Sequence, residues 1–155
     1  NPKNAELFTQ HLSDVYRYIL QCQNQRLATL NDELGFLDSY IFLHQVRLGD
    51  CIRVHNYIPE EWKEMKLPPL TLQLLVENVI KHNVIHSGKP MVIELISIEE
   101  PPGLIISNPI RPKKCGGTSG MGLKNLSARY RLLSNQDIVI KIDSDKFTIK
   151  IPLFQ

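Results

Sequence analysis

Near the start of the chain, apolar residues recur at spacings of three and four, which is the pattern of a helix with one apolar stripe. This stripe contains Leu7, Phe8, Leu12, Val15, Ile19 and Cys22. A second helical pattern begins after Thr29, whose hydroxyl can cap a helix with Asp32 three residues later, and it stops at Gly49. We therefore expect two consecutive helices, and the apolar stripe of the first needs a partner.

Further along the chain, strand-like and helix-like patterns are interspersed. Alternating apolar and polar residues predict strands over residues 51–58, 91–99, 103–108, 138–143 and 147–153. Helical periodicity predicts helices over residues 70–85 and 123–133. Short turns favour two antiparallel hairpins, one at Pro101 and Pro102 and one at residues 143–145. The expected fold is α/β: a two-layer α/β sandwich, in which helices cover one face of a mixed sheet, with an additional N-terminal helix.

The composition is ordinary for a globular protein and excludes several classes of function. The chain has 155 residues, of which 43% are hydrophobic and 22% are charged, and its net charge is +2. This balance argues against a nucleic-acid surface, and no apolar stretch is long enough to cross a bilayer. The 3 cysteines show no CxxC spacing, so zinc is not expected. Because the sequence does not begin with methionine, we expect a piece of something longer.

The predicted helix over residues 70–85 carries an unusual polar face. Asn78, Lys81 and His82 stand at i, i+3 and i+4, and Glu77 lies one turn before Lys81, so these side chains share one side of the helix. The opposite side is apolar. One interpretation is a binding face, and the other is a solvated face with a Glu77–Lys81 pair, which is commoner when spacing is the only argument.

A glycine-rich stretch, "CGGTSGMGLKNL" over residues 115–126, is the second unusual feature. Glycines let the backbone approach an anion closely, and the N-terminus of the following helix favours negative charge, so phosphate is the natural ligand. The alternative is a flexible surface loop. The stretch is neither a Walker A motif, because GxxxxGK[ST] is missing, nor a Rossmann fingerprint, because no strand runs directly into it.

Taken in order, "LTLQLLVENVIKHN", "GLIISN" and "GTSGMGLKNLSARYRLL" resemble the N, G1 and G2 boxes of the GHKL ATPase superfamily. More narrowly, they resemble the ATP-binding domains of LytS-like sensor histidine kinases. "LSDVYRYIL" and "TLNDELGFLDSYIFLHQVRLGD" are similar to the helix before that domain and to its first helix. The resemblance implies the Bergerat fold. It also implies that residues 1–27 are the second helix of the dimerisation and phosphoacceptor hairpin, and that residues 28–155 form the catalytic domain.

The resemblance also implies a role for each residue of the site. Asn78 would ligate Mg²⁺, Lys81 would reach toward the phosphates of ATP, and Glu77 would orient the metal or accept a proton. These three residues form the expected catalytic set. The remaining expected cofactor-binding residues are His82, Asn108, Thr118, Gly120, Met121, Gly122 and Leu123. The amides of Gly120 and Gly122 would hold the phosphates as the lid over residues 109–119 closes.

The G1 box departs from the family pattern. Asn108 stands where the family has an aspartate that accepts a hydrogen bond from the adenine amino group, and Pro109 and Ile110 follow in place of glycines. An asparagine oxygen accepts the same bond without charge assistance, which is a loss of about 1 kcal/mol. The alternative to an active kinase is therefore a catalytically weakened nucleotide-binding or scaffold domain. Leu74 stands where the ATP-driven clamps of the superfamily have a glutamate, which disfavours that branch.

We do not expect any histidine of this sequence to be the phosphoacceptor. In the family it lies in a stretch similar to "PHFLFN", and none of His11, His44, His55, His82 and His86 has that context. The expected activity is therefore Mg-ATP-dependent phosphoryl transfer to a histidine located upstream. The resemblance further implies a homodimer formed through the N-terminal hairpin, a response regulator as partner, and a cytoplasmic location. The membrane would be reached only through upstream segments of an inner-membrane sensor.

Overall fold

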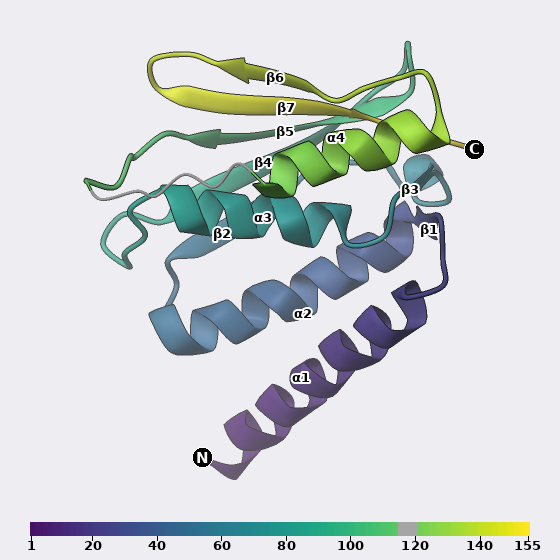
Figure 1. Cartoon of the computed structure of the whole chain (residues 1–155). Coiled ribbons are helices and arrows are strands. Elements are labelled where there is room, and N and C mark those ends of the chain that lie inside the picture. Colours follow the sequence, from purple (N-terminus) through teal and green to yellow (C-terminus); the bar gives the residue numbers. More distant parts are fainter. Residues whose placement is uncertain (115–120) are drawn as a thin grey trace.

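One layer of the molecule is a mixed five-stranded sheet (Figure 1). The computed structural model describes residues 1–114 and 121–155. The strands of this sheet are β2 (Ile52–Asn56), β4 (Met91–Ile98), β5 (Gly103–Pro109), β6 (Val139–Ile142) and β7 (Lys146–Pro152). Their order is β2-β4-β5-β7-β6, with β2 parallel to β4 and all other neighbours antiparallel. Both predicted hairpins, β4–β5 and β6–β7, are confirmed.

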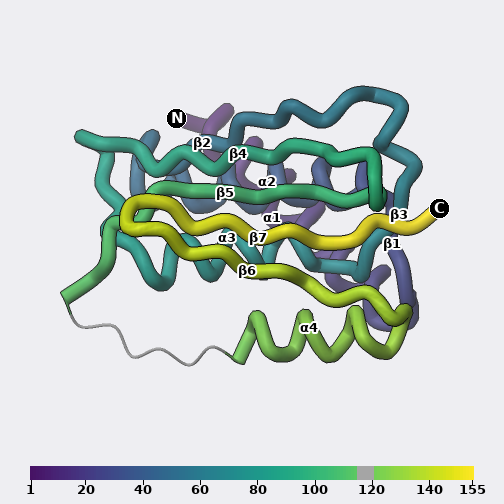
Figure 2. The backbone as a smooth tube through the Cα atoms, turned by 90° about the horizontal axis from the view of Figure 1, so that it is seen from above, coloured from purple at the N-terminus to yellow at the C-terminus, as the bar shows by residue number. Residues whose placement is uncertain are grey.

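Helices form the second layer on one face of this sheet (Figures 1 and 2). They are α2 (Leu30–Leu48), α3 (Thr71–His82) and α4 (Met121–Leu133), while α1 (Pro2–Cys22) packs on the outer side of α2. The short strands β1 (Ala28–Thr29) and β3 (Lys66–Leu67) pair beside them, and a 3-10 turn, η1, spans Glu60–Trp62. The expected α/β sandwich with an additional N-terminal helix is thus confirmed.

Strand register decides which side chains reach the helical layer. Leu104 and Ile106 on β5 pair with Ile151 and Ile149 on β7, and all four side chains are buried. Successive strand residues point to opposite faces, so Asn108 follows Leu104 and Ile106 on the same inner face. The apolar core therefore ends at a polar side chain at the end of β5.

The ends of α2 are as the sequence predicts. The Thr29 hydroxyl accepts a hydrogen bond from the Asp32 amide at 3.1 Å, and this bond satisfies one of the unpaired amides of the first turn. The helix ends before Gly49, whose φ of 76° lies in the region that glycine adopts without strain. Capping by Thr29 and termination at Gly49 are both confirmed.

The apolar stripe of α1 is covered by α2 only in part. Val15 and Cys22 are buried, but Leu7, Phe8 and Ile19 remain 49%, 36% and 37% exposed. The ring of His11 lies against that of Phe42 in a tilted arrangement, and its Nδ1 lies 2.9 Å from the Ser39 hydroxyl. The polar ring of His11 therefore shares this interface with the apolar residues. The homodimer expected through the N-terminal hairpin stays a prediction.

Helix α3 is shorter than its periodicity predicts. We expected it to continue to Ile85, but it ends at His82, and Asn83 is extended. The Asn83 side chain donates to the Val79 carbonyl at 2.9 Å and accepts from the Arg111 amide at 2.7 Å. These bonds end the helix and tie it to the segment that follows β5.

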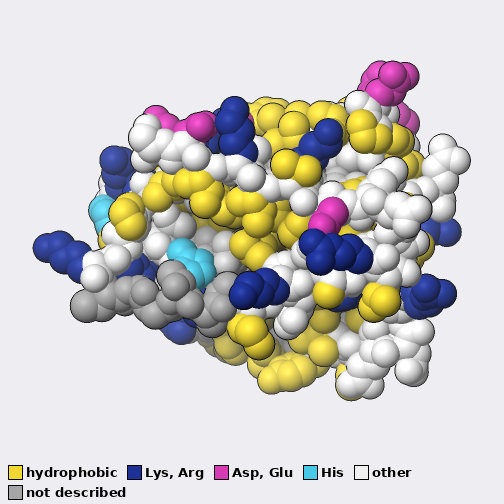
Figure 3. Space-filling view, turned by 45° about the horizontal axis from the view of Figure 1, so that its top comes forward, with side chains coloured by type: hydrophobic (Ala, Val, Ile, Leu, Met, Phe, Trp, Pro, Cys, Tyr) yellow, Lys and Arg dark blue, Asp and Glu magenta, His cyan; other side chains and the backbone are white. Residues whose placement is uncertain are grey.

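The exposed face of the sheet is rich in apolar side chains. Figure 3 shows them gathered on this side of the molecule, with Lys and Arg side chains between and around them. On this face, Val139 of the edge strand β6 and Ile96 of β4 are 59% and 39% exposed. Within the described residues, no helix combines the length and apolar character that a membrane span requires.

Candidate functional site

A cavity of about 530 Å³ lies between α3, the end of β5, the start of α4 and the tip of the β6–β7 hairpin. Its lining residues are Asn78, Val79, His82, Asn83, Asn108, Ile110, Pro112, Lys113, Lys114, Leu123, Ile142 and Phe147. This volume lies within the range of roughly 300–1,000 Å³ that is usual for small-molecule sites. Apolar side chains share the lining with polar and charged groups, so the cavity suits a ligand that has both apolar and polar parts.

A second cavity, of about 280 Å³, adjoins the first. Its lining residues are Leu74, Glu77, Asn78, Lys81, His82, Met121 and Gly122. Asn78 and His82 line both cavities. One elongated ligand could therefore extend along α3 from the first cavity into the second and pass Asn78.

The four polar residues of α3 lie together, as their spacing predicts. The opposite face of the helix buries Leu72, Leu75 and Val76 against the core. Glu77 and Lys81 are exposed, while Asn78 and His82 are half-buried. Glu77 accepts a hydrogen bond at 2.7 Å from the side-chain nitrogen Nε2 of Gln73, one turn earlier. Its carboxylate is therefore engaged along the helix, at the mouth of the smaller cavity.

Asn108 is 3% exposed and points into the larger cavity from the end of β5. Its Nδ2 donates to the Pro109 carbonyl at 2.8 Å. Oδ1 is the only acceptor atom of this side chain, and no described residue donates a hydrogen bond to it. Such an acceptor is what an exocyclic amino group of a ligand requires.

The start of α4 forms the wall opposite α3. Met121 and Gly122 line the smaller cavity, and Leu123 lines the larger one. A Cβ at Gly122 would lie 3.7 Å from the Leu74 side chain, so α4 begins in close contact with α3. Two of the expected binding residues, Thr118 and Gly120, lie outside the described residues.

Several lining residues were missed by sequence reasoning. Asn83 was expected to lie inside a helix, and nothing local indicated that its amide would join α3 to Arg111. The guanidinium of Arg111 donates to the carbonyls of Lys89 and Pro90, at 2.6 and 3.3 Å, and so fixes the nearby loop. Lys113 and Lys114 line the larger cavity. The basic run "RPKK" over residues 111–114 is the only local sequence signal for these cations.

The N-terminal end of α3 is held by residues outside both cavities. Leu70 has a φ of 66°, and its side chain does not cap the helix. The carboxylate of Glu33, a fully buried residue of α2, takes that role by accepting hydrogen bonds from the amides of Leu70 at 3.1 Å and Leu72 at 3.3 Å. The Tyr18 hydroxyl donates to the same carboxylate from α1.

Burial is the largest influence on the pKa values of Glu33 and Tyr18. Desolvation raises the pKa of the Glu33 carboxyl, and the hydrogen bonds from Tyr18 and from the backbone of residues 70–72 oppose that rise. Burial, with the nearby charge of Glu33, raises the pKa of Tyr18 far above its ordinary value. The Tyr18 hydroxyl therefore stays protonated and remains a donor over the whole physiological pH range.

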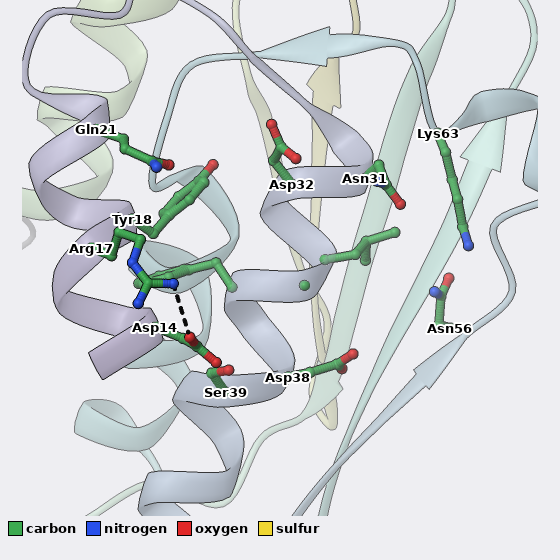
Figure 4. A pocket seen from close by; sticks show the side chains of 13 residues that line it. Asp14, Arg17, Tyr18, Gln21, Asn31, Asp32, Asp38, Ser39, Asn56 and Lys63 are labelled. Carbon is green, nitrogen blue, oxygen red and sulfur yellow. Dashed lines mark hydrogen bonds and ion pairs between the residues drawn. The ribbon is translucent and has the colours of Figure 1, made fainter. Parts of the chain in front are cut away.

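A larger and more open groove, of about 590 Å³, lies along α1 and α2 (Figure 4). Figure 4 shows mainly polar side chains along it, among them Asp14, Arg17, Asp38 and Lys63. Asp14 and Arg17 form an exposed ion pair within α1. Of the predicted binding residues that the structure describes, none lines this groove.

Comparison with known proteins agrees with the class that the sequence resembles. Residues 1–52 match the model of the histidine kinase family. The chain is similar to the sensor protein kinase HptS of Staphylococcus aureus, from strains USA300 and COL, with 35% identity over 82 residues. That match covers 53% of this chain and 16% of the relative. The chain therefore spans about one sixth of the length of this curated relative.

The fold is also that of a histidine kinase structure. The chain is similar to the Acinetobacter baumannii histidine kinase AdeS with a TM-score of 0.52 and 12% identity, over 93% of this chain and 76% of that one. The family model and the relative agree with the resemblance to sensor histidine kinases, and the structural match shows a shared fold. The LytS-like subclass, the boundary between residues 27 and 28 and the roles of the site residues stay predictions.

Proposed function

We propose that this chain is the ATP-binding catalytic part of a sensor histidine kinase, and that it transfers the γ-phosphoryl group of ATP to a histidine located upstream. The observation that carries the proposal is the position of Asn78. This side chain lies where two adjoining cavities meet, with Asn108 in one and the start of α4 beside the other. The proposal places adenine in the larger cavity and extends the triphosphate past Asn78.

The residues present fit the chemistry of adenosine triphosphate. Val79, Ile110 and Phe147 supply apolar surface for a flat ring, and Asn108 Oδ1 can accept from the adenine amino group. Lys113 and Lys114 at the larger cavity, and Lys81 at the smaller, supply positive charge for phosphate oxygens. Phosphoryl transfer requires mainly positioning and charge neutralisation, and these are what such residues provide.

The donor set also fits Mg²⁺ held jointly by protein and nucleotide. The described residues contain no group of three or more His, Cys, Asp or Glu side chains that could hold a metal. Asn78 offers one oxygen ligand of the kind that Mg²⁺ prefers, and phosphate oxygens would supply others. When bound, Mg²⁺ would offset the charge of the phosphates.

A specific observation favours a second candidate function, a weakened nucleotide-binding or scaffold domain. Asn108 stands where the family has an aspartate, so a single uncharged oxygen would accept the hydrogen bond from adenine in place of a charged carboxylate. In this alternative the chain binds nucleotide weakly and acts by conformational coupling. Measurements of binding and of transfer separate the two candidates.

Substitution of Asn78 tests the nucleotide site. We expect the parent chain to bind Mg-ATP with micromolar to submillimolar affinity, and Asn78→Ala to raise the dissociation constant by about 30-fold or more. The reason is that the variant loses a contact with a strongly charged ligand, which is worth about 2 kcal/mol. Isothermal titration calorimetry measures both constants.

The matched control is Asn4→Ala, which changes an exposed asparagine in α1 that lines neither cavity. Its dissociation constant should equal that of the parent. If the parent releases no heat with any adenine nucleotide, or if Asn78→Ala binds as the parent does, the proposed site is wrong.

Phosphoryl transfer is tested in a longer protein that includes the upstream hairpin. With radiolabelled ATP, we expect label that is labile in acid and stable in base, as a phosphorylated histidine is. The same protein with Asn78→Ala should incorporate less than about a tenth of this label, because the nucleotide site is lost. Binding of Mg-ATP without any transfer would support the scaffold function instead of the kinase.

A further inference from the structure

We propose that Glu33 is a positioning residue that couples the placement of α1 to the orientation of α3, and so sets the affinity of the site for nucleotide. The inference rests on the proposed function, because it concerns the same cavities. It assigns a role to a buried carboxylate that the proposed chemistry does not use.

The orientation of α3 depends on Glu33 because α3 has no cap of its own. The first four amides of a helix have no partner within it, and Leu70 precedes α3 without a side-chain cap. The two oxygens of Glu33 accept from the amides of Leu70 and Leu72. Asn78 lies six residues beyond Leu72, about 9 Å along the same rigid helix. A shift of the Glu33 carboxylate therefore displaces the wall that carries Asn78.

Tyr18 links that carboxylate to α1. Its hydroxyl donates to Glu33 Oε2, the oxygen that also accepts from the Leu70 amide. Its ring stacks on Phe36 of α2, with centroids 4.7 Å apart. In Figure 4 the side chain of Tyr18 extends from α1 toward α2. Rotation or sliding of α1 would move this donor and change how Glu33 holds the amides of α3.

The opposite wall of the site is tied to the same turn. Arg129 of α4 donates from Nη2 to the Pro69 carbonyl at 2.7 Å, directly before Leu70. Helix α4 also carries Met121 and Gly122 at the smaller cavity. Both walls are therefore held by hydrogen bonds at residues 69–72. Glu33 connects α1 to this turn, because it accepts hydrogen bonds from both Tyr18 and the turn.

The first test removes the hydroxyl of Tyr18 alone. We expect Tyr18→Phe to raise the dissociation constant for Mg-ATP about fivefold, within the usual range of coupling between two sites. The matched control is Tyr16→Phe, because Tyr16 lies on the same helix and is 61% exposed. This control should bind as the parent does. Equal binding by Tyr18→Phe and the parent would overturn the proposed coupling.

A double-mutant cycle then shows whether the effect passes through Glu33. Glu33→Gln keeps one acceptor oxygen but presents an NH₂ group to the amides of α3. In this background, Tyr18→Phe should change the dissociation constant by less than about twofold, because the path is already broken. A fivefold effect that persists in the Glu33→Gln background would show that Tyr18 acts by another route, and the inference would fail.

Hydrogen exchange provides a readout that does not depend on nucleotide. In Tyr18→Phe, the amides of Leu70 and Leu72 should exchange about fivefold faster than in the parent, while those of Ile93 and Leu104 in the sheet stay unchanged. Uniform acceleration of all four would indicate general destabilisation and would overturn the coupling. If the parent binds no nucleotide, the proposed function fails, and these exchange rates alone decide whether α1 and α3 are coupled.

Discussion

Replacement of Glu33 by alanine is expected to lower the free energy of unfolding by about 3 kcal/mol. The variant leaves the amides of Leu70 and Leu72 and the hydroxyl of Tyr18 without their acceptor. Each buried donor without a partner costs roughly 1–3 kcal/mol. Removal of the carboxylate also removes its own desolvation cost, the cause of its raised pKa, so the net loss is smaller than the sum of these terms. Urea unfolding followed by circular dichroism measures the change.

The control for this prediction is Glu6→Ala, which removes an exposed carboxylate from α1. Its unfolding free energy should stay within about 0.5 kcal/mol of the parent value. Glu33→Gln should lie between the two variants, because it keeps one acceptor. If Glu33→Ala loses less than about 1 kcal/mol, Glu33 is not the cap of α3, and the mechanism proposed for Tyr18 fails with it.

Regular elements were predictable because their signals are local. The capping of α2 by Thr29 needs only residues three positions apart, and the hairpins need only alternating strands and a short turn. The shared face of Glu77, Asn78, Lys81 and His82 follows from helical geometry in the same way. These parts of the fold required no knowledge of what lies across the core.

The supporting contacts of the site were not predictable because they join segments far apart in the sequence. From the sequence, Glu33 is an acidic residue in the first turn of a helix. Its role as a cap depends on contact with Leu70, which lies 37 residues later in the chain. Leu70 carries no signal for a positive φ, because glycine and asparagine are the residues that usually adopt it. Asn83 belongs to an uninterrupted helical pattern in the sequence, but the helix ends before it, where its side chain bonds to Arg111. Tertiary contacts override local preference in each case.

The last prediction concerns Gly103, at the start of the strand that carries Asn108. A Cβ at this position would lie 2.6 Å from the backbone carbonyl oxygen of Ile151 on β7, a separation that neither strand can accommodate without moving. We expect Gly103→Ala to lower the unfolding free energy by about 2 kcal/mol, which is typical of overpacking in a well-packed region. Denaturant titration measures the loss.

A glycine-to-alanine substitution in a helix should change the unfolding free energy in the opposite direction. A Cβ at Gly35 in α2 would meet no described atom within 4 Å, so Gly35→Ala should raise the unfolding free energy by about 0.5–1 kcal/mol through helix propensity. Comparison of the two variants shows the effect of the steric contact alone, because both variants add one methyl group to a glycine. If Gly103→Ala also leaves stability unchanged or raises it, β5 and β7 do not approach as closely as the register requires. Asn108 would then be placed less firmly at the cavity, because it follows on the same strand.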